Sequence, residues 1–403
     1  MDTKRAYYGL RTFEFQYDPA WIENPNAIPL SVSLPFQKES FGGVAYIFFD
    51  NILPESHARD YISRILKVFP ENIYALLREL GGDCAGALKF YPEDVAPDPA
   101  KGFYQPLSPA ELADVVERLQ PFPFLVRSEG VRLTLAGAQD KLPVHFDGTT
   151  VFLPRNDAPS THILKPPCIR FESTVINEAF CMTLAKNAGL PVPDCRIVQA
   201  GDMPLFLVDR YDRKYVDGRI VRIHQEDFCQ AMGLCADEKY QEHGGPGFAN
   251  CANFLRKQSA SPEKDIELLA KWCVANVLLG NADGHAKNLS LLYDQGSTPR
   301  LAPFYDIIST LAYESICPKF SMKIGKKNRI KWIMKQHWER FANDLGLEPI
   351  KFLQDMSEFC QTMKEAIIPT LESMKSQGED VVFLEKLESD TRKRIERTLQ
   401  EIK

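Results

Sequence analysis

The order of the predicted strands and helices is the feature that most limits how this chain can fold. Short β-branched and apolar runs follow one another between residues 131 and 209, and the turn Asp147-Gly148 joins two of them into a hairpin. One helical pattern, over residues 172–190, interrupts this block. From about residue 214 to residue 403 the apolar spacing becomes helical. A strand-rich block with one embedded helix, followed by a helical block, predicts an α+β fold with two lobes.

A third region, residues 1–125, precedes these blocks. Its apolar run over residues 42–54 is typical of a strand, whereas residues 56–69 and 72–82 have helical spacing. The chain is therefore expected to contain an N-terminal accessory α/β subdomain (1–125), a strand-rich N-lobe (126–213) and an all-helical C-lobe (214–403).

Composition and charge limit the partners and the compartment. The formal net charge of −6 argues against a broad basic face for nucleic acid, so a DNA contact would come from a local patch or a partner. The N-terminus has no signal-peptide pattern, and no apolar run approaches the roughly 20 residues that span a bilayer. The ten cysteines form no CxxC pair and mostly sit in apolar segments, which suits free thiols in a reducing cytoplasm.

The stretch "NADGHAKNLSLLYDQGSTPRLAPFYDIIST", residues 281–310, carries the strongest chemical pattern. Asp283 and Asn288 have the D-x-x-x-x-N spacing at which a protein kinase places its catalytic base and a metal-binding amide. Two short strands with a turn between them would bring Asp306 back to the same place as a second metal ligand. Mg²⁺ takes oxygen ligands and keeps several waters, so one Asp and one Asn beside phosphate oxygens suffice. The alternative is a polar loop that ends a helix, because Asp-Gly is common turn chemistry.

Upstream residues fit the same chemistry. Lys165 ends the strand "THILK" and would bind ATP phosphates, with Glu178 of the following helix as its partner. A solvated lysine before Pro166-Pro167 is the alternative, and Glu172 at the head of the helix competes with Glu178. The segment "TLAGAQDKLPV", residues 134–144, stands where a kinase has its phosphate loop, although a plain β-turn fits it equally well. "FLVDRYDR", residues 206–213, stands where adenine would be held, or is a simple edge strand.

Eight motifs in order resemble the HipA family of bacterial toxin-antitoxin kinases over nearly the whole chain. They are "TLAGAQDKLPV", "THILKPP", "NEAFCMTLAKNAGL", "DRYDR", "HQEDFCQAMG", "KYQEHGGPGF", "NADGHAKNLSLL" and "APFYDIIST". The resemblance implies a two-lobed, protein-kinase-like fold and a serine/threonine-protein kinase that uses ATP and Mg²⁺. It also implies growth inhibition through phosphorylation of a translation component such as glutamyl-tRNA synthetase. A HipB-like helix-turn-helix antitoxin would hold the kinase in check, and the complex would repress its own operon.

The resemblance assigns roles to individual residues. Asp283 is implied as the catalytic base, with Asn288 and Asp306 as Mg²⁺ ligands. Thr134 stands where the family has an autophosphorylated serine. The implied ATP-binding residues are Ala136, Gly137, Ala138, Gln139, Asp140, Lys141, Lys165, Asp209, Arg210, Tyr211, His285, Lys287, Asn288, Tyr305 and Asp306.

Several alternatives stay open from the sequence. The same base and metal residues would serve a kinase of a small molecule or lipid. The large N-terminal region would also suit a catalytically silent scaffold that joins an antitoxin at an operator. The basic stretch from Lys323 is either a DNA contact or, as the acidic net charge favours, a solvated loop and helix face.

Overall fold

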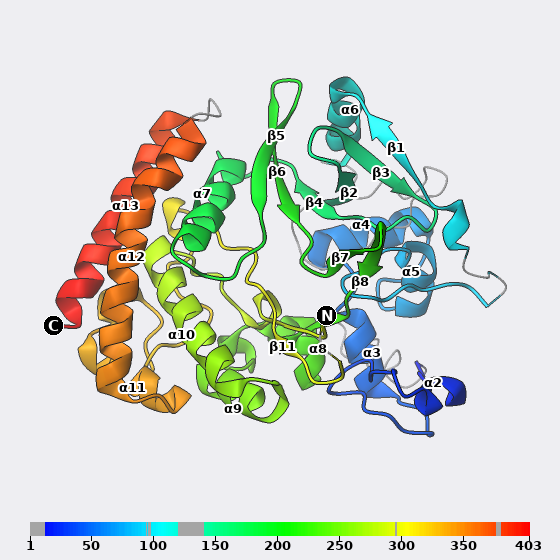
Figure 1. Cartoon of the computed structure of the whole chain (residues 1–403), viewed down its shortest axis with the longest axis horizontal. Coiled ribbons are helices and arrows are strands. Elements are labelled where there is room, and N and C mark those ends of the chain that lie inside the picture. The colour runs from blue at the N-terminus through cyan, green and yellow to red at the C-terminus, as the bar shows by residue number, and fades with distance from the viewer. Residues whose placement is uncertain (1–12, 94, 96–97, 120–140, 295, 376–379) are drawn as a thin grey trace. The chain divides into compact units, whose positions relative to one another are not determined.

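The computed structural model describes residues 13–93, 95, 98–119, 141–294, 296–375 and 380–403 (Figure 1). These residues form two compact units. Unit 1 consists of the described residues up to Pro166 together with Val198–Ala236 and Leu291–Pro299, and unit 2 consists of Pro167–Ile197, Asp237–Ser290 and Arg300–Lys403. No helix in the described part of the chain is long and apolar enough to cross a membrane.

Unit 1 is built on a six-stranded sheet. Its strands, in the spatial order β1-β3-β2-β4-β6-β5, are β1 (Phe103–Leu107), β3 (Val151–Arg155), β2 (Leu142–Phe146), β4 (His162–Lys165), β6 (Met203–Asp209) and β5 (Cys195–Ala200). The predicted hairpin around Asp147-Gly148 is present, because β2 and β3 pair antiparallel and the Asp147 carboxylate accepts hydrogen bonds from Thr149 and Thr150. The predicted strand at residues 131–135 lies outside the described residues.

The helix α6 (Pro109–Leu119) and the sheet share one core in unit 1. Leu112 and Val116 of α6 belong to the same buried cluster as Val144, Leu164 and Leu207 from the strands. The helix begins after Ser108, which exchanges hydrogen bonds with Glu111 across the first turn. The stretch "YPEDVAPDPAKGFYQP", residues 91–106, is typical of surface loop because of its prolines and glycine. Its last residues nevertheless belong to β1, which pairs with β3 over its whole length.

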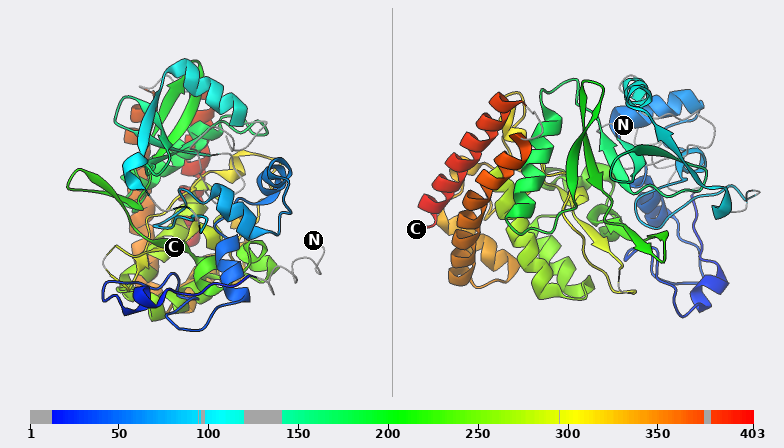
Figure 2. Two further views of the ribbon diagram at one scale, coloured as in Figure 1. Left: turned by 90° about the vertical axis from the view of Figure 1, so that its right-hand side faces the viewer. Right: turned by 45° about the horizontal axis from the view of Figure 1, so that its top comes forward.

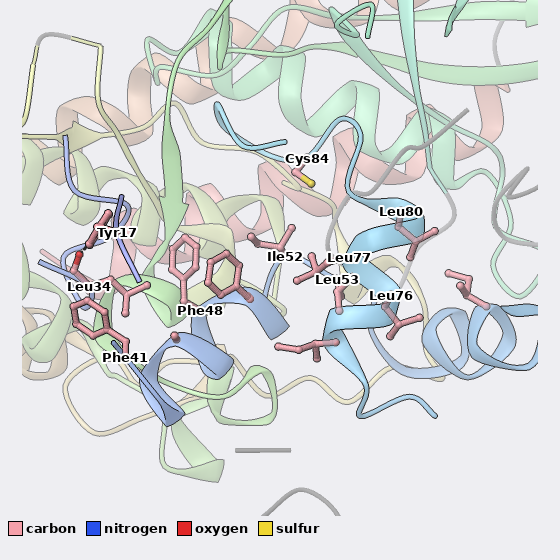
Figure 3. Close-up of a cluster of buried hydrophobic side chains, with 14 residues drawn as sticks. Tyr17, Leu34, Phe41, Phe48, Ile52, Leu53, Leu76, Leu77, Leu80 and Cys84 are labelled. Atoms are coloured by element: carbon pink, nitrogen blue, oxygen red, sulfur yellow. Dashed lines mark hydrogen bonds between the residues drawn. The ribbon is translucent and has the colours of Figure 1, made fainter. Parts of the chain in front are cut away.

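The apolar run at residues 42–54 is a helix, not the predicted strand. Helix α3 spans Gly43–Asp50, and its buried side chains Ala45, Phe48 and Phe49 recur at helical spacing on one face. A short continuous apolar run cannot be assigned to strand or helix by periodicity alone, which is why the prediction failed. Figure 3 shows Phe48 in the N-terminal core, which α3 shares with residues of the helix α5 (Ile73–Leu80).

Other short elements complete unit 1. The helices α2 (Pro19–Glu23), α4 (Ser56–Leu66) and α8 (Phe228–Met232) accompany η1 (Pro99–Lys101), the hairpin β7 (Arg213–Val216) and β8 (Arg219–Arg222), and the strand β9 (Gln225–Asp227). The helical predictions for residues 56–69 and 72–82 are confirmed by α4 and α5.

Unit 2 is mainly helical. The range 214–403 was predicted to be all-helical, but short strands also lie within it. Its longer helices are α7 (Thr174–Asn187), α9 (Phe248–Gln258), α10 (Pro262–Leu279), α11 (Lys335–Leu345), α12 (Pro349–Lys375) and α13 (Val381–Glu401). Figures 1 and 2 show α12 and α13 lying side by side, and α12 also packs on α7. The short strands β10 (Ser290–Leu292) and β11 (Arg300–Leu301) are neighbours in one sheet, where the Ala302 amide donates to the Ser290 carbonyl at 2.8 Å.

Candidate functional site

The loop that contains Asp283 begins where α10 ends in unit 2. Gly280 terminates the helix with a positive φ of 76°, a conformation that glycine adopts without steric cost. The Asn281 amide then donates to the Asn276 carbonyl, and the Asp283 amide donates to the Asn281 side chain at 3.1 Å. Asp283 itself is exposed to solvent.

The glycine after Asp283 is required by packing. A Cβ on Gly284 would lie about 3 Å from the Asn276 amide and from the buried Trp272 ring, and its φ is not in the left-handed region. Gly284 therefore lets the loop lie directly on α10. The loop also ends α10 and turns at Ala282 and Asp283, so the alternative of a polar helix-ending loop fits this geometry as well.

Asn288 is fixed at the other end of the loop. The His285 amide donates to Asn288 Oδ1 at 3.0 Å, and both side chains are buried, as is that of Lys287. The amide oxygen of Asn288 has two lone pairs, so one hydrogen bond leaves it able to bind a metal ion. One loop therefore contains the exposed carboxylate of Asp283 and, five residues later, the amide oxygen of Asn288, which a hydrogen bond holds in place.

Asp306 lies in strained backbone after β11. Its φ is +54°, which is uncommon outside glycine and costs of order 1–3 kcal/mol. The segment is held in place by its neighbours: the Tyr305 hydroxyl donates to the Lys287 carbonyl at 2.6 Å, and the Ser309 amide donates to Asn177 of α7 at 2.8 Å. Such a backbone conformation persists where the surrounding contacts hold it in place.

The oxygen groups predicted as metal ligands in unit 2 are of the type that Mg²⁺ takes. Asp306 would supply a carboxylate and Asn288 an amide oxygen, hard ligands that Mg²⁺ prefers beside phosphate oxygens and water. No group of three or more His, Cys, Asp or Glu residues that could hold a metal occurs in the part of the chain that the structure describes.

The lysine predicted to bind phosphate is buried in unit 1. Lys165 ends β4 with a relative exposure of 5%, and its Nζ lies 5.7 Å from the ring centre of Phe206 on the paired strand β6. A solvated lysine is therefore the wrong description of this residue. Of the two glutamates considered as its partner, Glu178 is buried in α7 whereas Glu172 is exposed.

The segment from Asp209 to Tyr211 follows β6. The Asp209 carboxylate lies 3.0 Å from His162 Nε2, and the Tyr211 hydroxyl donates to the side chain of Gln225. The side chain of Arg210 is almost fully buried and points into a network of charges rather than into solvent.

That charge network joins the segment to the N-terminal part of unit 1. Arg210 donates to both carboxylate oxygens of Asp212, and Arg213 pairs with Asp83 at 2.9 Å. Burial alone would raise the pKa of Asp83, but Arg210, Arg213 and Arg222 together hold it well below its usual range. Arg210 thus fixes the backbone of the segment from Asp209 to Tyr211.

Part of the predicted phosphate loop lies outside the described residues. This applies to Thr134 and to Ala136, Gly137, Ala138, Gln139 and Asp140. Lys141, directly before β2, is described and is half-buried.

Several residues that contact the segments of the candidate site were not predicted from the sequence. Arg394 of α13 donates to the carbonyls of Leu278 and Leu279 at the end of α10, where a cation offsets the negative end of the helix. Asn177 holds the segment after Asp306, and Tyr240 hydrogen-bonds Asp283. None of these residues belongs to a spacing that predicts a site, because their roles depend on tertiary packing.

Comparison with known proteins identifies the family to which the chain belongs. The HipA-like C-terminal domain model matches residues 133–367, and the HipA N-terminal domain model matches residues 6–91. "Putative kinase Y4mE" of Sinorhizobium fredii is 40% identical over 364 residues, covering 89% of this chain and 86% of that protein. The serine/threonine-protein kinase toxin HipA of Shewanella oneidensis is 29% identical over 388 residues, covering 92% of this chain and 86% of that protein.

A solved structure shares the fold. It is the Shewanella oneidensis complex of HipA, HipB and operator DNA, in which the matching chain has a TM-score of 0.84 and 27% identity, covering 97% of this chain and 93% of that one. The predicted α+β, protein-kinase-like fold is thereby confirmed. With a family model over more than half of its length and a relative at 40% identity, the chain belongs to the HipA family of kinases.

Proposed function

We propose that this protein is a serine/threonine-protein kinase toxin of a HipBA-like toxin-antitoxin system. It transfers the γ-phosphate of ATP to a translation component, of which an aminoacyl-tRNA synthetase such as glutamyl-tRNA synthetase is the expected example. A HipB-like helix-turn-helix antitoxin restrains it in the cytoplasm, and the pair represses its operon with DNA contacts made mainly by the antitoxin. The support for a partner is the solved HipA relative, which was captured with HipB and operator DNA.

The observation that carries the proposal is the arrangement around Asp283 in unit 2. An exposed carboxylate, a held amide oxygen on Asn288 and a strained aspartate, Asp306, are the three oxygen groups that phosphoryl transfer uses. Asp283 accepts the proton of the acceptor hydroxyl. Asn288 and Asp306 hold Mg²⁺, which neutralises charge on the phosphates when bound.

The remaining nucleotide-binding roles in this proposal are carried over from the family resemblance. Lys165 binds the ATP phosphates from β4, and residues 136–141 form the phosphate loop. Asp209 and Tyr211 flank the adenine. Arg210 contributes indirectly, because its buried ion pairs with Asp83 and Asp212 hold the backbone between them in place. His285, Lys287 and Tyr305 are further residues that we propose bind the nucleotide.

Expression and labelling experiments test the proposal. The purified protein with Mg-ATP labelled at the γ-phosphate should phosphorylate a protein in a cell extract, and its expression should arrest growth. Asp283→Asn should abolish both effects, whereas the matched change Asp294→Asn, at an exposed turn residue, should abolish neither. Comparing phosphoproteins and phosphorylated metabolites between the two variants identifies the acceptor. Labelling of a metabolite alone would refute a protein kinase, and growth arrest that survives Asp306→Ala would favour a silent scaffold.

A further inference from the structure

Tyr240 hydrogen-bonds the aspartate proposed as the catalytic base. Its hydroxyl lies 3.0 Å from Asp283 Oδ1. The phenol O–H donates this bond, because a carboxylate oxygen only accepts. An effect of Tyr240 on the reaction would therefore act through Asp283.

The Tyr240 ring is held on several sides within unit 2. It packs edge-to-face on the His285 imidazole at 5.1 Å between centroids, and on that of His243 at 5.6 Å. Lys239 Nζ lies 5.4 Å from the ring centre. A ring with these neighbours has a defined direction, so the hydroxyl is a fixed donor rather than one that samples many positions.

The backbone around Tyr240 is equally constrained. Tyr240 precedes the short turn η3 (Gln241–His243), and the amides of His243 and Gly245 both donate to the Tyr240 carbonyl. Gly245 lies so close to the carbonyls of Glu238 and Tyr240 that a Cβ there would collide with them. The segment is thus a compact turn and not a hinged flap.

A second set of hydrogen bonds ties this turn to the catalytic loop. The Gln241 amide donates to the Ser321 carbonyl at 3.3 Å, and the Lys323 amide donates to the Gln241 side chain at 2.7 Å. The Ser321 amide in turn donates to the carbonyl of Ala282 at 2.9 Å, the residue directly before Asp283. Tyr240 and Asp283 are therefore fixed relative to each other by backbone as well as by their own contact.

The catalytic base of a kinase needs a fixed orientation. The terminal torsion of an aspartate is broad, so an exposed carboxylate rotates unless a donor holds it. The base must also present an oxygen within about 2.6–3.2 Å of the acceptor hydroxyl. A donor fixed on one carboxylate oxygen sets the plane of the group and thereby the direction of the other oxygen.

We propose that Tyr240 is a positioning residue for phosphoryl transfer, whose hydroxyl orients the Asp283 carboxylate toward the acceptor. This inference rests on the proposed role of Asp283. Two other roles for Tyr240 predict different results. If the ring served only for packing, removal of the hydroxyl would not change the reaction rate. If the hydroxyl blocked the acceptor, its removal would raise the rate.

Steady-state kinetics of Tyr240→Phe test the proposal. We measure kcat and KM for Mg-ATP with dephosphorylated casein, and with the chain itself, as phosphate acceptors. Loss of one hydrogen bond to a charged group should lower kcat by about tenfold while KM for ATP stays unchanged. Tyr74→Phe, an exposed tyrosine of α5, serves as the matched control and should change neither constant. A kcat for Tyr240→Phe equal to or above that of the unaltered protein would overturn the inference.

A spectroscopic measurement separates this inference from the proposed function. 3-Fluorotyrosine placed at position 240 should give a ¹⁹F resonance that shifts when Asp283 is changed to Asn, because the acceptor loses its charge. A resonance that does not move would overturn the hydrogen bond whether or not the protein transfers phosphate. A shifted resonance in a protein that binds ATP but labels no acceptor would instead refute the kinase assignment and leave the Tyr240 contact standing.

Discussion

The hydroxyl of Tyr305 donates a hydrogen bond to the backbone carbonyl of Lys287, with 2.6 Å between the oxygens. This contact joins the residue before the strained Asp306 to the loop that ends at Asn288. The Ser290 hydroxyl lies 2.7 Å from the same phenol oxygen and completes the arrangement. The two proposed metal ligands are therefore held by one tyrosine as well as by their own backbone.

Tyr305→Phe should weaken both the fold and the reaction. The Lys287 carbonyl would lose its donor, a loss that costs about 1–3 kcal/mol of unfolding free energy for a buried group. Small displacements of metal ligands also reduce phosphoryl transfer, and we expect kcat to fall by about tenfold. Chemical denaturation and labelling with Mg-ATP measure the two effects. Tyr215→Phe, in the exposed β7–β8 hairpin, should leave both unchanged, and equal activity of the two variants would contradict the role of Tyr305.

Phe48→Ala should severely destabilise the N-terminal core of unit 1. The side chain is completely buried in α3 and forms an edge-to-face pair with Phe49 at 5.2 Å. Removing a buried phenylalanine costs about 3–5 kcal/mol through lost burial and the cavity left behind. Phe69→Ala is the matched control because Phe69 is 67% exposed, and its cost should stay well under half of that value. Urea unfolding of both variants checks the difference.

The sequence predicted most of the elements but not the contacts that position the site. Strands such as β4 and helices such as α10 were predictable because local spacing and end signals determine them. The apolar run over residues 42–54 was wrongly predicted as a strand, because tertiary packing decides which face of α3 is buried. The D-x-x-x-x-N spacing of Asp283 and Asn288 is local and so was visible. Tyr240 contacts this loop from 43 residues away, and Arg394 contacts the end of α10 from more than 100 residues away. No local pattern marks such distant partners.

Asp83→Asn should destabilise unit 1 strongly at neutral pH. The change leaves the buried guanidinium groups of Arg210 and Arg213 short of one negative charge, and breaking a buried pair costs about 3–5 kcal/mol. The contrast is Asp114→Asn, which breaks an exposed pair with Arg118 and should cost less than about 1 kcal/mol. Thermal and denaturant unfolding at pH 7 compare them, and similar losses in both variants would contradict a buried network.

The contribution of Asp83 should also disappear in acid. Its pKa is lower in the folded protein than in the unfolded chain, so the folded state binds fewer protons and gains stability as pH rises. The stabilisation is therefore present at neutral pH and is lost as the pH falls below the unfolded value of about 4. The difference in unfolding free energy between the unaltered protein and Asp83→Asn should shrink below that pH.

Glu226→Gln should have the opposite pH dependence, because Glu226 is a buried carboxyl without a cationic partner among the residues whose contacts are described. Burial raises its pKa from 4.5 to about 7, while hydrogen bonds from Ser31, Tyr293 and the Val32 amide act against that rise. The folded state thus binds a proton more tightly than the unfolded chain. The stability that this proton provides is present below the unfolded pKa and is lost as pH rises through about 7.

Glutamine cannot titrate, so Glu226→Gln should not lose this stability as the pH rises. The unfolding free energy of Glu226→Gln, minus that of the unaltered protein, should increase between pH 4.5 and pH 8 by up to about 3 kcal/mol, at about 1.4 kcal/mol for each unit of pKa. The other titratable groups near this site, Asp227, His224 and Tyr17, are the same in both proteins and largely cancel in the difference. Guanidinium unfolding across this range measures it. A difference that stays constant with pH would mean that Glu226 titrates equally in the folded and unfolded chain, and a difference that falls would mean that the folded state holds it as a carboxylate.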